Sequence, residues 1–191
     1  MRLSKIFSSV AGISLLALSL TGCATNASPT GTNGKMMAPN MDHGSMHTMA
    51  ITDKQSFAEA MIPHHQQAID MSNYAITNTS NPEVLAIAEK ISSEQGPEID
   101  KMTPWLAGKS VDYSMMMTGM ISPMQLATLQ VSKDGDFDKL FIQFMIQHHD
   151  GAVSMAGEAI GVNDPELTDF ANEIIRTQSA EIEELMALQN K

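Results

Sequence analysis

Three observations predict an all-α protein whose domain is a four-helix bundle made of two repeated helical hairpins. The phrase Met-Ile-x-His-His occurs at Met61–His65 and again at Met145–His149, and each copy has a methionine six residues after its last histidine. Around both copies, apolar residues recur at the spacing of an amphipathic helix. No stretch alternates apolar and polar residues in the way that predicts a strand. Two hairpins that each bury one face complete such a bundle.

The repeat extends beyond this phrase. A shift of 84 positions also superposes Phe57 on Phe141 and Ala75 on Ala159. After a gap of one residue the match continues through two further segments, which pair Pro82 with Pro165, Gln95 with Gln178, and Glu98 with Glu181. We therefore assign the repeats to about 53–107 and 136–190, inside a single domain that spans 53–191.

Residues 1–22 have the features of a lipoprotein signal peptide. Arg2 and Lys5 give a basic start, and the apolar stretch from Ile13 to Leu20 is too short to span a membrane. The sequence Leu-Thr-Gly-Cys that ends at Cys23 resembles a bacterial lipobox, which implies cleavage before this cysteine and its lipidation. The alternative is a plain secretory signal followed by a chance cysteine. Both export the chain, and since no aspartate follows the cysteine we expect an outer-membrane anchor that faces the periplasm.

Residues 23–52 are predicted to form a flexible, disordered tether, because they are rich in Asn, Ser, Thr, Gly and Pro. Methionine contributes no burial in a linker, yet the second half of this one is rich in methionine and histidine. That half resembles the Met/His-rich segments of periplasmic copper-resistance proteins, and the alternative is a linker without a metal function. The predicted metal-capturing residues of the tether are Met41, His43, Met46, His47 and Met49.

The charge of the chain argues against nucleic acid as a partner. Its formal net charge is −11, and loss of Arg2 and Lys5 with the signal peptide takes this to −13. Such a surface repels a phosphate backbone. Acidity is compatible with attracting cations and is also a common route to solubility. Cys23 is the only cysteine in the sequence, so the folded domain has no disulfide or thiolate site.

The first helix is expected to begin with a capping box at Thr52–Gln55. Pro63 is expected to bend this helix or to lie near an irregular start, whereas Gln147, its equivalent in the second copy, has no such effect. At about 100° per residue, one set of side chains falls on the core-facing half of the helix. That set comprises Met61, His64, His65 and Met71.

The second helix of each hairpin has the same start signal. Asn81 and Asp164 are predicted N-caps, and each is followed by a proline and then a glutamate. We expect these helices to run to about Leu106 and Gln189, with a kink at Gly96-Pro97 in the first of them. Gly161 is expected to end the first helix of the second hairpin.

Each second helix places a glutamine and a glutamate on its apolar stripe. Gln95 and Glu98 lie on one stripe, and Gln178 and Glu181 lie on the other. Buried polar groups cost free energy unless they are paired or bind something. We expect the glutamates to orient histidine N–H groups or to bind a metal directly. The alternative is that these residues lie near the end of the bundle, in water.

The connector between the hairpins is also rich in sulfur. Ser122-Pro123 is expected to start a short helix that ends at Lys133–Gly135. Two interpretations of the connector stay open: it is a loop that covers a site, or its methionines are adaptable filler. These methionines are Met115, Met116, Met117, Met120 and Met124.

Together these features resemble one family, domain of unknown function 305. The resemblance covers roughly residues 53–191 and is carried by the paired Met-x-x-His-His-x-x-Ala-x-x-Met phrases, the Gln-x-x-Glu-Ile segments, and Gly119-Met120 leading to Gly135-x-Phe-Asp. It implies a ferritin-like four-helix bundle and copper binding outside the cytoplasm. The candidate ligands that it implies by position are Met61, His64, His65, Met71, Met145, His148, His149 and Met155, with Gln95, Glu98, Met102, Gln178, Glu181 and Met186 from the second helices.

The two histidines of each phrase are expected to have different neighbours. Adjacent residues of a helix point about 100° apart, so both imidazoles do not reach one ion without a bend. The two repeats are also expected to differ, because Leu185 aligns with Met102 and Met186 is displaced by one position.

The leading hypothesis is a periplasmic lipoprotein that captures or sequesters copper, contributes to copper tolerance or homeostasis, and is not an enzyme. Thioether ligands favour Cu(I) over Cu(II), while imidazole binds both. The expected partners are copper ions, the membrane through the lipid on Cys23, and other periplasmic copper-handling proteins.

Two alternatives stay open. One is a ferritin-like di-metal redox enzyme, although the sequence has no Glu-x-x-His and offers only Glu98 and Glu181 as suitable carboxylates. The other is a structural or interaction module without metal, whose buried polar residues fix the register of the helices.

Overall fold

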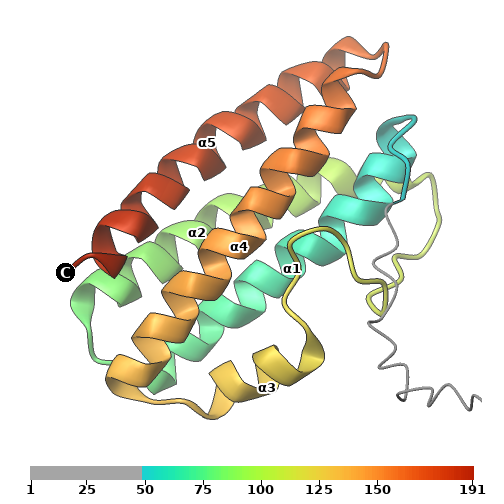
Figure 1. The fold of residues 1–191 in the computed structure, drawn as a ribbon. Coiled ribbons are helices and arrows are strands. Elements are labelled where there is room, and N and C mark those ends of the chain that lie inside the picture. Colours follow the sequence, from blue (N-terminus) through green and yellow to red (C-terminus); the bar gives the residue numbers. More distant parts are fainter. Residues whose placement is uncertain (1–48) are drawn as a thin grey trace, which may run out of the picture. The chain divides into compact units, whose positions relative to one another are not determined.

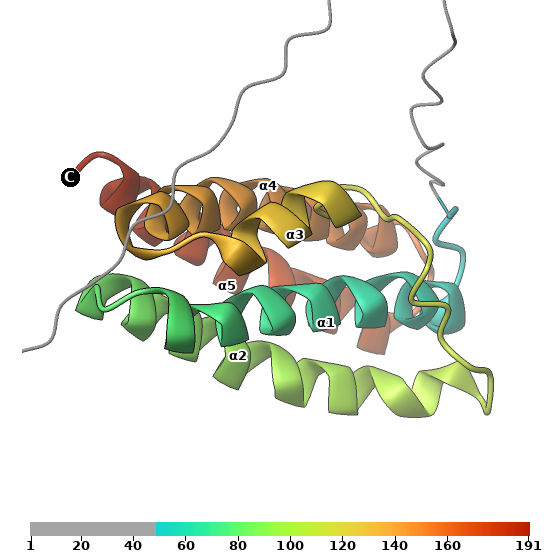
Figure 2. The same cartoon turned by 90° about the horizontal axis from the view of Figure 1, so that it is seen from below.

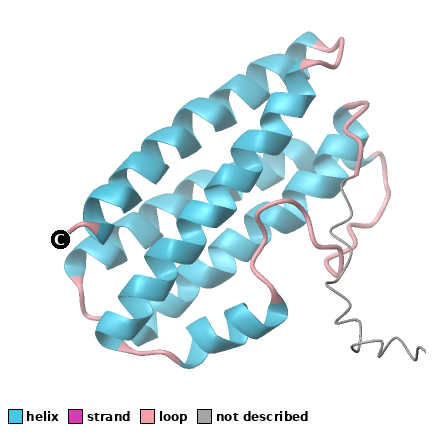
Figure 3. Cartoon of the chain, in the orientation of Figure 1, coloured by secondary structure: helices cyan, strands magenta, loops and turns pink. Residues whose placement is uncertain are grey.

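Helices supply all the regular structure in the part of the chain that the structure, a computed structural model, describes: residues 49–191 (Figures 1 and 3). The all-α class predicted from the sequence is confirmed. The elements are α1 (Lys54–Asn78), α2 (Pro82–Met102), the 3-10 helix η1 (Thr103–Leu106), α3 (Pro123–Val131), α4 (Asp134–Ile160) and α5 (Pro165–Gln189). The predictions for the signal peptide, for Cys23 and for Met41, His43, Met46 and His47 of the tether lie outside the described residues.

The four long helices form two hairpins. α1 packs along α2, and α4 packs along α5. The two hairpins meet chiefly through α1 and α4, while α3 lies against both of these helices on the outside of the bundle (Figure 2). This is the predicted four-helix bundle of two hairpins. Within residues 49–191, no helix combines the length and the apolar character needed to cross a membrane.

Side-chain caps fix where the helices begin. Asn81 accepts the N–H of Glu83, Asp164 accepts that of Leu167, and Ser122 starts α3, all as predicted. The predicted start of α1 is wrong by one residue. Asp53, not Thr52, is the N-cap, because its carboxylate accepts the Ser56 N–H at 2.7 Å while the Ser56 hydroxyl accepts the Asp53 N–H at 3.1 Å.

The predicted end of α3 is also wrong. α3 ends at Val131, and Lys133 is already the N-cap of α4, whose first residue is Asp134. The acidic side chains of Asp134 and Asp136 suit the positive end of the α4 dipole better than the negative end of α3. α1 and α2 both continue through their internal prolines, and α4 ends just before Gly161 as expected.

The core is divided along the bundle into two apolar clusters. Phe57 and Phe170 belong to the first cluster, and Phe137 and Phe141 belong to the second. Along every long helix, the polar residues predicted to face inward lie between the residues that enter the two clusters. They are therefore in the middle of the bundle and not near its end. We call this set the mid-bundle layer: His64, His65, His148, His149, Gln95, Gln178, Glu98 and Glu181.

Candidate metal centre

Two histidines from equivalent positions of the two repeats meet in the mid-bundle layer. The ring centroids of His64 and His148 lie 3.7 Å apart, with 37° between the ring planes. Neither side chain has any exposed surface. Because α1 and α4 are the helices through which the hairpins meet, this pair joins one repeat to the other.

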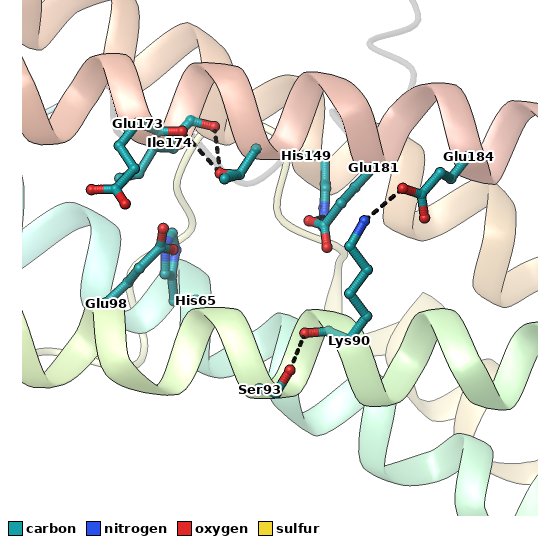
Figure 4. A network of polar contacts seen from close by, with 10 residues as sticks. His65, Lys90, Ser93, Glu98, His149, Glu173, Ile174, Glu181 and Glu184 are labelled. Carbon is teal, nitrogen blue, oxygen red and sulfur yellow. Dashed lines mark hydrogen bonds and ion pairs between the residues drawn. The ribbon is translucent and has the colours of Figure 1, made fainter.

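The other histidine of each phrase contacts a glutamate on the second helix of its own hairpin (Figure 4). His65 Nε2 lies 2.7 Å from Glu98 Oε2, and His149 Nε2 lies 2.9 Å from Glu181 Oε2. Both imidazoles are fully buried. The two histidines of each phrase therefore have different neighbours, and each glutamate of the apolar stripe is paired with a histidine.

Oxygen partners determine which ring nitrogen offers a lone pair. The carbonyl oxygen of Thr118, 3.1 Å from His64 Nε2, can only accept a hydrogen bond, so we assign the hydrogen to that nitrogen. The carboxylates of Glu98 and Glu181 accept from His65 and His149 in the same way. In the neutral form of these three rings the lone pair is thus on Nδ1. Oxygen groups that hold one ring N–H commonly orient histidines that bind a metal through the other nitrogen.

Many polar atoms of the layer have no hydrogen-bond partner among the described residues. Each such buried atom costs about 1–3 kcal/mol, so native interiors hold few of them. A bound cation would give a partner to the lone pairs among these atoms, which are those of imidazole nitrogen and of amide and carboxylate oxygen, though not to the amide N–H groups. The atoms are Nδ1 of His64, His65 and His149, both ring nitrogens of His148, both amide atoms of Gln95 and Gln178, and Oε1 of Glu181.

Burial keeps the central histidine pair neutral. Loss of solvation is the largest cause that lowers the pKa of His64 and of His148 well below the ordinary value of 6.5. Repulsion from the neighbouring histidines lowers both pKa values further. Neutral imidazole is the form that binds metals, so this pair is ready to bind at pH 7 without first losing a proton.

Methionine sulfur borders the layer on both sides. Met61, Met102 and Met155 belong to the first apolar cluster, and Met71 and Met145 belong to the second. All five are buried. Within residues 49–191, no three side chains of the types His, Cys, Asp and Glu are grouped to hold one ion. Besides the carboxylates of Glu98 and Glu181, which contact histidines, this part of the chain offers the amide oxygens of Gln95 and Gln178 within the layer and buried thioethers at its borders.

Met186 is a predicted ligand that the structure does not bring to the layer. Its side chain is 48% exposed, whereas Leu185 is completely buried. A displacement of one residue turns a side chain by about 100° around the helix axis. Leucine therefore takes the place in the second repeat that Met102 has in the first. Met49, the tether residue that the structure does describe, is half-buried and packs against the first cluster.

Sequence reasoning missed the residues that hold the connector over the layer. Gln67 accepts the Ile121 N–H at 2.7 Å and donates to the Ile121 carbonyl oxygen at 3.0 Å. A Cβ atom on Gly151 would lie 2.1 Å from the Thr118 carbonyl oxygen, so only glycine allows this approach. Glycine inside a helix is destabilising by about 0.5–1 kcal/mol relative to alanine, and this anomaly two residues after His149 was the available signal.

The family model described as "Domain of unknown function (DUF305)" matches residues 53–189. The chain belongs to this family. The match includes every residue of the mid-bundle layer, and the family named from the sequence motifs is thereby confirmed.

Several solved structures have a similar fold. CopM in its Cu(II)-bound form is 36% identical, with a TM-score of 0.63 over 74% of this chain and 98% of that one. CopM in its Cu(I)-bound form is 34% identical, with a TM-score of 0.61 over 72% and 96%. A putative secreted DUF305 protein from Streptomyces coelicolor is 25% identical, with a TM-score of 0.66 over 73% and 93%.

One curated relative shares a shorter segment. The uncharacterized protein L153 of Acanthamoeba polyphaga mimivirus is 34% identical over 58 residues, which are 30% of this chain. The match spans 38% of the length of L153.

Proposed function

We propose that this protein binds copper in the mid-bundle layer and captures or sequesters it outside the cytoplasm. The observation that carries the proposal is the set of buried Nδ1 lone pairs on His64, His65 and His149, each on a ring whose Nε2–H is held by an oxygen. Imidazole nitrogen together with thioether sulfur suits copper above the other common metals. The solved forms of CopM with Cu(II), Cu(I) and Ag support the same choice.

Cu(I) is the proposed preferred state. The buried sulfurs of Met61 and Met145 lie one helical turn before the two histidine pairs, and soft thioethers favour Cu(I) over Cu(II). Thioethers and the neutral imidazoles of His64 and His148 bind without releasing a proton, so at these ligands no deprotonation competes with capture near neutral pH.

The proposed place of action is the periplasmic face of the outer membrane, through a lipid on Cys23. The tether would then add its own methionines and histidines to those of the bundle. Binding and handover to other periplasmic copper proteins, without catalytic turnover, is the proposed role. The available ligands support this role. A di-metal oxidase site uses a carboxylate from each of the four helices, whereas this layer has two carboxylates, and both are paired with histidines.

The test is a competition titration of the purified protein against a chromogenic Cu(I) chelator without oxygen. The double variant His64→Ala/His148→Ala is expected to weaken the tightest site at least about a hundredfold, since both rings of the central pair are lost. Ser72→Ala is the matched control. It also truncates a buried side chain with an unpaired polar atom, but at a position outside the layer.

Thermal unfolding gives a second measurement. A ligand present at 100 times its Kd raises the free energy of unfolding by about 2.7 kcal/mol if it binds only the folded state. We expect Cu(I) and Ag(I) to raise the Tm of the wild type and of Ser72→Ala, but to leave that of the double variant almost unchanged. If the wild type and the double variant bound Cu(I) with equal affinity, the proposal that copper binds in the mid-bundle layer would be wrong.

A further inference from the structure

Four methionines lie within six residues of the connector 107–122: Met115, Met116, Met117 and Met120. Their burial is graded. Met115 and Met116 are half-buried, Met120 is 9% exposed, and Met117 is 2% exposed. All four pack in the first apolar cluster, which also contains the fully buried Met61 and Met102. Sulfur therefore continues from the partly exposed surface into the core without leaving one packed cluster.

The inner part of the connector, 117–121, is fixed to both hairpins. Gln67 on α1 makes two hydrogen bonds with the backbone of Ile121, and Gln147 on α4 donates to the Gly119 carbonyl oxygen at 3.3 Å. The neighbouring carbonyl oxygen, that of Thr118, accepts from His64. The methionine-bearing segment thus makes direct contact with His64, one member of the central histidine pair.

The outer part of the connector is held more lightly. Its contacts to the helices include one ion pair, Lys109 Nζ to Glu59 Oε1 at 2.8 Å, in which the lysine is 59% exposed and the glutamate 21% exposed, and the Asp112 carboxylate accepts hydrogen bonds from Ser114 within the loop. Exposed ion pairs contribute about 0–1 kcal/mol. Met115 and Met116 stand at the boundary between this lightly held part and the fixed inner part.

We propose that Met115 and Met116, with the tether residue Met49 that packs against the same cluster, form a transient site for soft monovalent cations, and that Cu(I) or Ag(I) passes through it to the mid-bundle layer. This rests on the proposed function. Met49 is half-buried and is the last methionine of the tether.

Desolvation explains why such a site is needed. An ion that enters an apolar cluster with no donor in reach loses its hydration without compensation, which creates a large barrier. Thioethers at successive depths replace the water ligands one at a time, and they are neutral, so no buried charge is left behind. A transient site of this kind speeds loading and release equally and leaves the equilibrium affinity of the layer unchanged.

The experiment compares Met115→Leu/Met116→Leu with Met124→Leu in the full protein. Leucine removes sulfur while nearly conserving volume. Met124 is the matched control, because its side chain is 81% exposed and lies outside the cluster. Stopped-flow transfer of Cu(I) from its bicinchoninate complex measures loading, and equilibrium competition measures affinity.

We expect the double variant to load about tenfold more slowly than the wild type, with final occupancy and affinity of the layer unchanged and Met124→Leu indistinguishable from the wild type. Loading at the wild-type rate would overturn the proposal, and so would a fall in equilibrium affinity, which would make these sulfurs permanent ligands. A wild type that takes up no Cu(I) would instead overturn the proposed function itself.

Discussion

The two repeats present the same polar residues to the middle of the bundle but hold them differently. His64 in the first repeat donates to the Thr118 carbonyl oxygen, whereas His148 has no partner among the described residues for either ring nitrogen. The carboxylate that holds His65 is 14% exposed, while the one that holds His149 is 1% exposed. Duplication accounts for the donor set. The connector, which gives an oxygen partner to His64 alone, makes the two halves unequal.

Sequence differences between the repeats occur where this inequality arises. Pro63 has no counterpart proline in the second repeat, where Gln147 donates to connector carbonyl oxygens instead. Met102 of the first repeat is replaced by Leu185. We therefore expect any copper in the layer to be bound asymmetrically, with the sulfur-rich side in the first repeat.

Removing the contact between the connector and α4 should have the largest effect. In Gly151→Ala the new Cβ would lie 2.1 Å from the Thr118 oxygen, so the inner connector must move and His64 loses its partner. We expect unfolding free energy to fall by about 1–3 kcal/mol. Gly157→Ala on the same helix has open space around its Cβ and should be neutral or stabilising by up to about 1 kcal/mol. Urea unfolding of both variants measures this, and equal stabilities would disprove the tight approach.

The two glutamates should differ in their effect on copper affinity. Glu181→Gln removes a carboxylate from a dry environment, and loss of an oxygen that orients a ligand histidine weakens metal binding about tenfold to a hundredfold. Glu98→Gln should have a smaller effect, because water can reach the partly exposed partner of His65. The Cu(I) competition titration compares the two. Equal losses would mean that burial does not distinguish the repeats.

Exchanging sulfur between the repeats should shift affinity by a smaller factor. Leu185→Met gives the second repeat the thioether that Met102 provides in the first, with a change in unfolding free energy under about 1.5 kcal/mol. We expect Leu185→Met to tighten Ag(I) binding and Met102→Leu to weaken it. Isothermal titration with Ag(I) measures both changes without any redox reaction. If neither substitution changed the Ag(I) affinity in the expected direction, these two positions would not supply a ligand to the ion.

The smallest effect should be the pH dependence of the metal-free protein. The pKa values of His64 and His148 are lowered in the folded state from 6.5, so below about pH 6.5 the unfolded chain binds protons that the folded chain does not. Stability should therefore fall as the pH drops below this value and level off above it. His64→Gln/His148→Gln should flatten the dependence in thermal unfolding between pH 5 and pH 7. If the slope of stability against pH stayed the same in this variant, groups other than His64 and His148 would cause the pH dependence.

Much of this arrangement was predictable because it is local or periodic. The caps at Asn81, Ser122 and Asp164 follow from side-chain oxygens placed just before a proline or an apolar run. Glu98 and Glu181 lie on the apolar faces of the second helices and recur at matching positions relative to the two Met-Ile-x-His-His motifs. Their pairing with histidines of these motifs therefore follows from helical spacing. A buried polar residue that is repeated in both halves needs a partner, and the histidines were the partners at hand.

The rest depends on contacts between distant segments. Thr118 reaches His64 through its backbone oxygen, which carries no side-chain signal, and the approach needs Gly151 on a different helix. Met186 was included because it lies next to the aligned position, but rotation about the α5 axis turns it outward and Leu185 inward. The capping box begins at Asp53 and not at the predicted Thr52, because a serine three residues after the N-cap can complete the box as well as a glutamine can.

The division of the core into two apolar clusters has a consequence for how long a molecule survives. Several polar atoms in the middle of the bundle have no partner among the described residues, and this is the place where cleavage by a protease is expected to start after local opening. An ion that binds several helices there would close this weak point. Turnover would then remove idle copies and spare loaded ones, so that the amount of protein follows the supply of metal.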